Sequence, residues 1–406
     1  MVKSKESTLA GDEQVAASAA LARASGRLGI DTEFMSEGRY RALLCLTQVG
    51  VEDPSEPTGI RTILIDGLDS PNIQPLAELL ADPSIEIVLH AARQDVAILR
   101  RVWQTEITNI FDTQVAAGFA GESAQAGYAN LLNSILGQRV AKTASYTRWD
   151  RRPLTAEQLA YAADDVAHLL QLADELQRRL TESGREQWAR EECRRLEGVS
   201  DERDPDAAWE RLPRTNSLDP RGRAIARRLA AWRERTAQSE DRPVNQVVSD
   251  QSLVELAKRH PTDNGALGQI RGLHPSVIKR RGAGIIAAVQ EGMEDPPIPR
   301  EERRARTDSA DTPLIALAEA LLRGRAMESG LAYELIASRA ELEQIVAAAR
   351  QSLPEPEVRT LTGWRRDLVG ADLEALLSGR TALAVEQKKR LSLHQLSDNG
   401  SIMPRQ

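Results

Sequence analysis

The sequence predicts an α/β domain, with a mixed sheet packed between helices, followed by all-helical domains. Two observations favour the first part: three short apolar stretches with turn-rich gaps, and then an alternation of strand-like and helix-like segments. A third observation favours the second part, because the pattern beyond about residue 220 is helical only. At roughly 150 residues per domain, a chain of 406 residues should form two to three domains.

The first domain begins with a pattern that favours a helix over residues 12–24. Strands are expected at residues 28–34, 41–49 and 62–66, and the Gly, Pro, Asp and Ser residues between them predict an antiparallel meander. A helix opening at Pro75, a buried strand at residues 85–90 and a helix over residues 91–103 follow. This alternation predicts a mixed sheet flanked by helices.

Residues 155–180 carry apolar side chains three, four or seven positions apart, which predicts one helix with an apolar face. Thr155 precedes Glu157 and Gln158, so its hydroxyl and an acidic or amide side chain near the third helical position indicate a capping box. We expect a single helix to close the first domain.

Two proline-containing segments divide the chain. Residues 200–220 contain three prolines and several Asp, Asn and Ser residues, and a second linker begins near residue 295. We therefore expect domains over residues 8–200 and 203–296, a linker over 297–311, and a third domain over 312–396. Ala/Leu-rich runs predict that this third domain is helical throughout, and it could be a second version of the helical module before it.

The composition limits the setting in which the protein works. There are 53 Lys and Arg residues against 60 Asp and Glu, a net charge of −7, so any nucleic-acid-binding surface must be local. Two cysteines, Cys45 and Cys193, cannot form a disulfide framework, and neither has the spacing of a zinc site. The N-terminus lacks the apolar run of a secretion signal. These features predict a cytoplasmic protein.

Acidic residues follow a pattern in the first domain. Asp31 and Glu33 alternate with apolar or small residues in the first strand, so both point to one face, about 7 Å apart at Cα. Two adjacent carboxylates repel one another, and a bound divalent cation would relieve that repulsion. A lone Asp-x-Glu is also compatible with a strand whose polar face is simply solvated.

Two further segments add to the pattern. Asp95 lies in the first helical turn after the strand at residues 85–90, where an acidic residue also favours the helix dipole. Tyr161 and Asp165 are four residues apart on the expected closing helix and share a face. Each feature alone has a structural explanation, whereas their ordered combination indicates a metal site.

The segments GIDTEF, HAARQD and YAADDV, in this order and spacing, resemble the three exonuclease motifs of the DEDD superfamily, in the branch that carries Tyr. They are most similar to the bacterial ribonuclease D family. Residues 111–114 and the run from Lys142 to Leu154 support the likeness, although Thr143 to Ser145 depart from the Glu or Gln common there. The resemblance covers residues 10–200 well; residues 205–295 resemble an HRDC module, and the last segment resembles a degenerate second copy.

The resemblance implies a ribonuclease H-like fold and a metal-dependent 3′-5′ exoribonuclease that releases 5′ mononucleotides from structured RNA such as tRNA precursors. Asp31, Glu33 and Asp165 would hold one divalent ion, Mg²⁺ or Mn²⁺, and Asp31 would bridge to a second ion supported by Asp95. Tyr161 would orient the attacking water, since a phenol is a poor base at neutral pH. Asp165 rather than the adjacent Asp164 keeps the Tyr-x-x-x-Asp spacing.

We expect the middle domain to contact the RNA. Residues 221–281 contain 13 Lys and Arg residues against 6 Asp and Glu. Within this region two clusters are candidates for binding phosphates by counterion release, although such clusters are often only solvated. The candidates are Arg227, Arg228, Lys279, Arg280 and Arg281.

Three other hypotheses remain open. The same chemistry would serve a 3′-5′ exonuclease that acts on DNA. A nuclease fold that has lost turnover would serve as a nucleic-acid-binding adaptor. The last segment could dock a protein partner instead of binding RNA.

Overall fold

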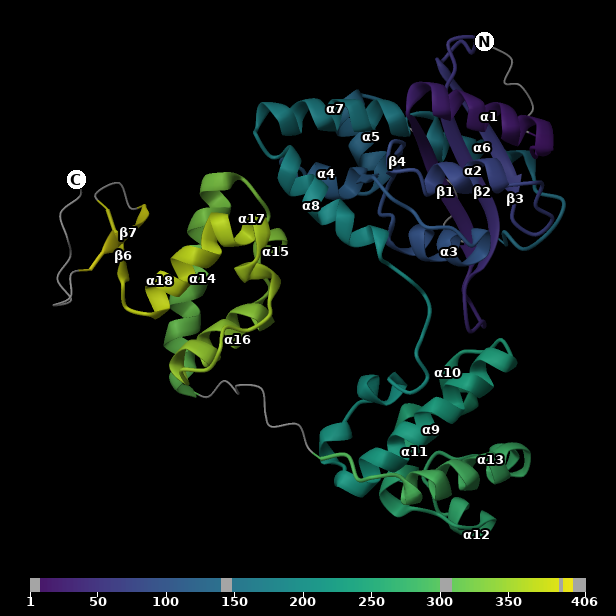
Figure 1. Ribbon diagram of the computed structural model, residues 1–406, viewed down its shortest axis with the longest axis vertical. Helices are drawn as coiled ribbons and strands as arrows, with labels where there is room; N and C mark the ends of the chain where they lie inside the picture. The colour runs from purple at the N-terminus through teal and green to yellow at the C-terminus, as the bar shows by residue number, and fades with distance from the viewer. Residues whose placement is uncertain (1–7, 140–147, 300–308, 387–389, 397–406) are drawn as a thin grey trace.

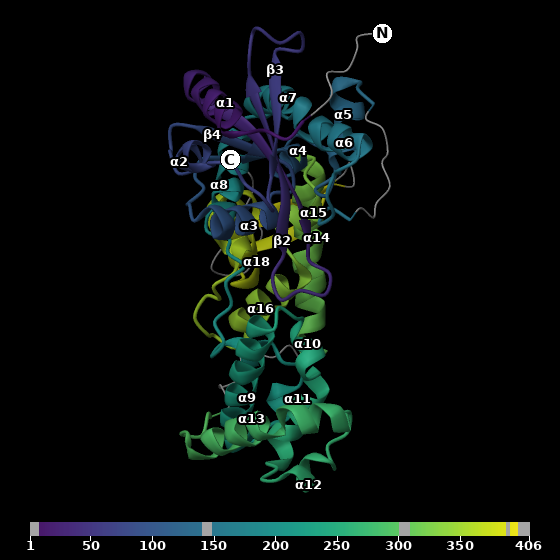
Figure 2. The ribbon, with the colours of Figure 1, turned by 90° about the vertical axis from the view of Figure 1, so that its right-hand side faces the viewer.

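The computed structural model describes residues 8–139, 148–299, 309–386 and 390–396, and these residues form three lobes (Figure 1). The first lobe is the α/β domain, which we call the nuclease-like domain. The second lobe is a helical domain that follows it, the middle domain. The third is the C-terminal domain, which lies beside the first (Figures 1 and 2).

A five-stranded mixed sheet forms the centre of the nuclease-like domain. Its strand order is β3-β2-β1-β4-β5; β1 to β3 pair antiparallel, whereas β4 pairs parallel to β1 and β5 parallel to β4. The predicted meander and mixed sheet are thereby confirmed. The strands are β1 (Arg27–Met35), β2 (Leu43–Glu52), β3 (Ile60–Asp66), β4 (Glu86–Leu89) and β5 (Ile110–Asp112).

Helices cover both faces of this sheet. On one face, α1, α2 and α3 pack against Leu28 and Ile30 of β1; on the other, the core joins α4, α5 and α7 to Val88 and Phe111. The helices are α1 (Asp12–Ser25), α2 (Gln74–Leu80), α3 (Arg93–Trp103), α4 (Thr113–Phe119), α5 (Tyr128–Leu136), α6 (Ala156–Ala167), α7 (Leu169–Glu182) and α8 (Glu186–Glu197).

The prediction of one helix over residues 155–180 is wrong. His168 leaves helical geometry, with φ −116° and ψ 4°, and ends α6 while starting α7. The end of α6 also lies against β2, because a Cβ added to Gly50 would come within 2.9 Å of the Val166 carbonyl oxygen. The predicted capping box is present: the Thr155 hydroxyl accepts from the Gln158 amide, and the Gln158 side chain accepts from that of Thr155.

The middle domain has an all-helical core of its own. Its long helices α9 and α13 pack together with α11 around Leu229, Leu256 and Ile285. Its elements are the 3₁₀ turns η1 (Ala208–Arg211) and η2 (Thr215–Ser217), then α9 (Pro220–Ser239), α10 (Val244–Val247), α11 (Asp250–Arg259), α12 (Asn264–Leu267) and α13 (Pro275–Glu294).

The prediction that the C-terminal domain is helical throughout is wrong. Its last described elements are two paired strands, β6 (Thr381–Val385) and β7 (Leu391–Gln395). Both strands alternate apolar with small or polar residues, which suits a half-exposed hairpin better than a helix. The other elements are η3 (Ser309–Asp311), α14 (Thr312–Ser329), α15 (Tyr333–Ile336), α16 (Arg339–Arg350), η4 (Arg359–Leu361), α17 (Gly363–Arg365), the π-helical turn η5 (Arg366–Gly370) and α18 (Ala371–Leu377).

The C-terminal domain shares a hydrophobic core with the nuclease-like domain. Phe119 and Leu176 of the first domain belong to the same buried cluster as Leu322 and Leu373 of the third. The Trp364 ring stacks on Trp188, with ring centroids 5.3 Å apart. This domain therefore packs firmly against α4 and α8 (Figure 1).

Two further observations concern the whole chain. Among the described residues, none of the helices combines the length and the apolar character needed to cross a membrane. The middle and C-terminal domains both open with a long helix, a four-residue helix and a helix of intermediate length, α9 to α11 and α14 to α16. That the third domain is a second version of the middle one stays a prediction.

Candidate active site

The site begins on β1, which brings two carboxylates to one face of the sheet. Ile30 and Thr32 are buried on one side, 1% and 6% exposed, while Asp31 and Glu33 alternate with them and remain half-buried. Pairing of Asp31 with Gln48 and of Glu33 with Leu46 fixes this register. The strand pattern therefore aims both acids away from the α1 to α3 side.

Asp95 reaches the same place from the first turn of α3. Strand β4 ends at Leu89, short of the β1 residues that carry the acids, so α3 begins beside them. The Thr32 hydroxyl donates a hydrogen bond to the Asp95 carboxylate, which is buried. A carboxylate in the first turn also has a favourable interaction with the helix dipole.

Helix α6 contributes Tyr161 and Asp165, one turn apart. The Tyr161 phenol and the Asp165 carboxylate lie close enough for each to shift the pKa of the other. The Tyr161 ring packs against Trp149 at a centroid distance of 6.2 Å, which fixes its direction. The structure thus brings together all five residues that the sequence singled out at the acidic site.

The electrostatics of the site follow from burial and from like charges. Burial first, and then repulsion from Asp165 and Asp95, raise the pKa of Glu33 to about 8. Burial also raises the pKa of Asp165 to about 7 and that of Asp95 to about 6. The pKa of Asp31 lies well above its ordinary value, through burial and then repulsion from Asp95, Asp165 and Glu33. The four carboxylates are therefore close enough to repel one another.

The donor set fits a divalent metal by its chemistry. Within the described residues, no lysine or arginine lowers the pKa of Glu33 or Asp165. Uncompensated carboxylate oxygens are the ligands that Mg²⁺ and Mn²⁺ prefer. The side chains as they stand are not closed around an ion: the described residues hold no group of three or more His, Cys, Asp or Glu in an arrangement that could bind one.

Sequence reasoning missed residues that support the site. The Asp112 carboxylate accepts hydrogen bonds from the Ala92 amide at 2.8 Å and the Gln114 amide at 2.8 Å, and so ties the approach to α3 to the start of α4. Tyr128 lies near Asp165, whose charge, after burial, raises the Tyr128 pKa. Residues 111–114 supplied a signal for Asp112, but nothing in the sequence indicated Tyr128.

The basic candidates lie in the middle domain, away from the acidic site, and most are paired. Arg227 and Arg228 contact Asp295 at 2.9 and 2.7 Å, and Arg281, which is buried, contacts Glu240 at 2.6 Å. Arg280 is 3.4 Å from the same Glu240. Lys279 is exposed, with no ion-pair partner among the described residues. Residues 142–147, which supported the resemblance, lie outside the described part.

Comparisons with known families agree with this geometry. The model of a 3′-5′ exonuclease family matches residues 8–181, and that of the HRDC domain matches residues 222–289. The chain is 37% identical over 383 residues to the ribonuclease D of Granulibacter bethesdensis, covering 93% of this chain and 94% of that protein. It is 36% identical over 364 residues to the ribonuclease D of Gluconacetobacter diazotrophicus, covering 88% and 89%.

Solved structures give the same picture. The crystal structure of Escherichia coli RNase D, described as an exoribonuclease involved in structured RNA processing, superposes with a TM-score of 0.81 at 28% identity, covering 92% of this chain and 99% of that one. The catalytic core of RRP6 from Trypanosoma brucei matches with a TM-score of 0.53 at 21% identity, a likeness of fold, over 72% and 84% of the two chains.

Proposed function

We propose a substrate and a mechanism for this chain, which belongs to the ribonuclease D family and is a 3′-5′ exoribonuclease. The chain trims the 3′ ends of structured RNA, such as tRNA precursors, with the help of two divalent ions. In each cycle a water oxygen bonds to the last phosphorus, and the bond from that phosphorus to the preceding 3′ oxygen breaks. The product is a 5′ mononucleotide and an RNA one residue shorter. The similar RNase D of E. coli is an exoribonuclease involved in structured RNA processing, and this supports the proposed substrate class.

The acidic residues would hold the ions. Asp31, Glu33 and Asp165 would bind one ion, and Asp31 would bridge to a second ion near Asp95. A pair of Mg²⁺ or Mn²⁺ ions supplies a lowered water pKa and stabilises charge on the leaving oxygen. The carboxylates would turn toward a common point on binding, because their present arrangement is open.

Tyr161 would orient the attacking water. Burial, followed by the neighbouring carboxylates, raises the pKa of the Tyr161 phenol further above its ordinary value. The hydroxyl therefore keeps its proton at neutral pH and can donate a hydrogen bond. A group in this state positions a water molecule and does not remove its proton.

One observation carries the proposal: four carboxylates from β1, α3 and α6 converge, so that Asp95 and Asp165 raise the pKa values of Asp31 and Glu33 beyond the effect of burial. Among the described residues, no lysine or arginine lowers the pKa of Glu33 or Asp165. Such an arrangement costs free energy in the absence of a ligand, so it points to a cation. A solvated strand face or a favourable helix dipole can explain single residues, but neither explains why the four carboxylates converge.

The direct test compares two neighbouring carboxylates on α6. Asp165→Asn should reduce mononucleotide release from 5′-labelled RNA by roughly a thousandfold or more, because it removes a proposed metal ligand. Asp164→Asn, an exposed neighbour outside the proposed ligand set, should stay within about threefold of the unmodified protein. Chelator should abolish the reaction, and circular dichroism should show both variants folded. Full activity in Asp165→Asn would overturn the proposal.

The same assay separates the two rival activities. Matched single-stranded RNA and DNA, each with a 3′ hydroxyl, should show faster shortening of RNA. Equal or faster shortening of DNA would favour a DNA exonuclease, and binding without products under Mn²⁺ would favour an adaptor.

A further inference from the structure

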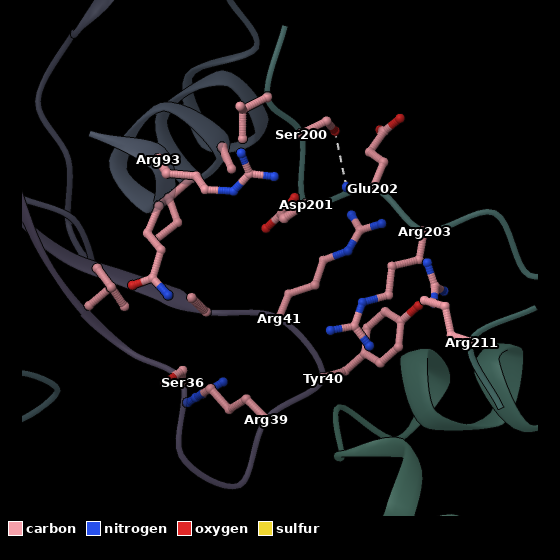
Figure 3. Close-up of a pocket in the computed structure, with 16 residues that line it drawn as sticks. Ser36, Arg39, Tyr40, Arg41, Arg93, Ser200, Asp201, Glu202, Arg203 and Arg211 are labelled. Carbon is pink, nitrogen blue, oxygen red and sulfur yellow. Dashed lines mark hydrogen bonds between the residues drawn. The ribbon is translucent and has the colours of Figure 1, made fainter. Parts of the chain in front are cut away.

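A cavity of about 590 Å³ lies between the nuclease-like domain and the middle domain (Figure 3). Three segments form its walls: the loop from β1 to β2, the first turn of α3, and the chain that enters the middle domain. Five arginines line it, and Figure 3 shows Arg41 and Arg93 beside Asp201, Arg203 and Arg211 beside Tyr40, and Arg39 beside Ser36. They are Arg39, Arg41, Arg93, Arg203 and Arg211.

The cavity carries more positive charge than the carboxylates of the described residues neutralise. Arg39 is paired with Asp241 at 2.7 Å, and Arg203 is 3.4 Å from Glu234. Among the described residues, the other three arginines, Arg41, Arg93 and Arg211, have no carboxylate within ion-pair distance. The Nε atom of Arg41 is buried and lacks a hydrogen-bond partner in the described part of the chain.

Acidic side chains do not offset this charge. Two of them line the cavity, Asp201 and Glu202. The Asp201 carboxylate is already bonded to Arg101, at 2.8 Å from its Nε. In the described part of the chain this leaves one lining carboxylate, that of Glu202, against three arginines without an ion-pair partner, and an anionic ligand would satisfy the remainder.

The cavity comes nearest to the proposed catalytic carboxylates along the chain at the first turn of α3. Arg93 and Gln94, which line it, immediately precede Asp95, whereas Phe34 packs on the face of the sheet opposite to Asp31 and Glu33. Its two walls are held in register by Tyr40, whose hydroxyl donates to Glu234 at 3.0 Å and whose amide donates to Asp241 at 3.1 Å. An RNA chain whose 3′ end lies at Asp95 would therefore meet this cationic surface at the start of α3.

We propose that this cavity binds phosphate groups of the substrate RNA upstream of the nucleotide being removed. The proposal rests on the proposed function and deepens it by naming residues that hold the substrate. Guanidinium groups bind phosphate oxygens through paired N–H donors. Base stacking is disfavoured, because Arg203 and Arg41 already lie over the Tyr40 ring at 5.4 and 5.8 Å. Binding at this cavity is therefore independent of base sequence.

The test measures binding of a fluorescent single-stranded RNA by anisotropy in chelator over a range of salt concentrations. The cavity triple variant is Arg41→Gln with Arg93→Gln and Arg211→Gln. Its plot of log Kd against log salt should lose about 2 units of slope, since each single-strand phosphate contact contributes about 0.7. Its affinity near 0.1 M salt should fall by about tenfold or more.

Two controls separate a phosphate site from a general effect of charge or folding. The control triple changes the net charge by the same amount as the cavity triple. It replaces three exposed arginines that have no ion-pair partner among the described residues, through Arg23→Gln, Arg194→Gln and Arg380→Gln. This control triple should keep the slope of the unmodified protein. The triple Arg→Lys variant of the cavity residues should recover most of the affinity, because the charges remain. Equal losses in the cavity and control triples, or no recovery with lysine, would overturn the proposal.

Shortening of the same RNA with Mn²⁺ keeps the two proposals apart. Suppose that the unmodified protein shortens the RNA and that the cavity triple variant binds the RNA as tightly as the unmodified protein. The cavity proposal is then wrong, and the proposed function stands. If the unmodified protein makes no shorter products but the cavity triple loses affinity and slope, the cavity proposal stands and the proposed function is wrong.

Discussion

Glu33 is a residue whose charge works against the fold when no cation is bound. Its pKa rises from an ordinary value of 4.5 to about 8 in the folded protein, through burial and then repulsion from Asp165 and Asp95. Between these values the folded state binds more protons than the unfolded state. The free energy of unfolding therefore decreases as the pH rises through this window.

Replacing this carboxylate should stabilise the metal-free protein. At pH 8.5 in chelator, Glu33→Gln should melt about 2 °C or more above the unmodified protein, because the repulsion is gone. At pH 4.5 the two should melt together, since Glu33 is then protonated. Scanning calorimetry checks this, with Glu78→Gln, an exposed position on α2, as the control. A lower melting temperature for Glu33→Gln at pH 8.5 would contradict the assigned cause.

Tyr161 offers a second prediction at this scale. Tyr161→Phe should lower kcat by about tenfold to a hundredfold, because the water loses one of its positioning groups. The shape of the pH profile between pH 6 and 9 should not change, since the Tyr161 phenol does not titrate there. Loss of an alkaline limb in the variant would instead identify the phenol as a base.

At single residues, spacing along the sequence predicted which acids lie together but not which arginines form ion pairs. Asp31 and Glu33 share a face because strand geometry has a period of two, and Tyr161 and Asp165 share one because of the helical turn. No such short period relates Arg228 to Asp295, which meet only because α9 and α13 pack together. Ion pairs that depend on packing between helices cannot be inferred from spacing along the chain.

At the scale of elements, the break between α6 and α7 shows what periodicity leaves out. The apolar spacing continues through residues 155–180, and His168 is neither Gly nor Pro, so no residue type signals a boundary. The β6–β7 hairpin was missed because the Ala/Leu-rich helices before it suggested a helical continuation. Strands and helices with strong periods and flanking turns, such as β1 and α3, were predicted to within a few residues.

The junction of β5 and α4 carries the third prediction. The Asp112 carboxylate caps α4 and also accepts from the Ala91 and Ala92 amides ahead of α3. Asp112→Ala would leave these buried donors without a partner and should cost about 2 to 4 kcal/mol of unfolding free energy. Activity should also fall, because the turn that leads to Asp95 loses its anchor. Urea denaturation and the nuclease assay check both.

Asp263→Ala is the matched control for this prediction. Asp263 caps the exposed helix α12 through the Ala266 amide at 2.8 Å, far from the sheet. Its loss should cost about 1 kcal/mol or less and leave activity unchanged. If Asp112→Ala behaved like this control, Asp112 would not support the site.

At the scale of the whole molecule, a buried ion pair joins the first and third domains. Arg365 is 1% exposed and bonds Glu192 of α8 at 3.0 Å, and the Trp364 ring nitrogen donates to the same carboxylate at 3.1 Å. Burial alone would raise the pKa of Glu192, but these partners hold it below its ordinary value. The pair therefore stabilises the docked state at neutral pH, and this stabilisation declines once the pH falls below the ordinary value of 4.5 and is lost as the pH falls through the lower pKa of the folded state.

Removing one partner should loosen the docking of the C-terminal domain. Glu192→Gln leaves a buried guanidinium without its counter-charge, at a cost of about 3 kcal/mol. The variant should show a lower urea midpoint and faster protease cleavage between residues 300 and 380. Glu343→Gln, which breaks an exposed pair with Arg339, should change neither by more than about 0.5 kcal/mol. Equal behaviour of the two variants would show that the pair does not hold the domains together.

The shared core also bears on how the protein is made. Ribosomes release α4, α7 and α8 before they have synthesised α14 and α18, which complete that core. At usual elongation rates of 5 to 20 residues per second, the delay is about 10 to 35 seconds. The middle domain, with its separate core, can fold during this delay, while the apolar side of α4 and α7 awaits its cover. Nascent chains therefore pass through an interval in which chaperones, or other nascent chains, have access to that side.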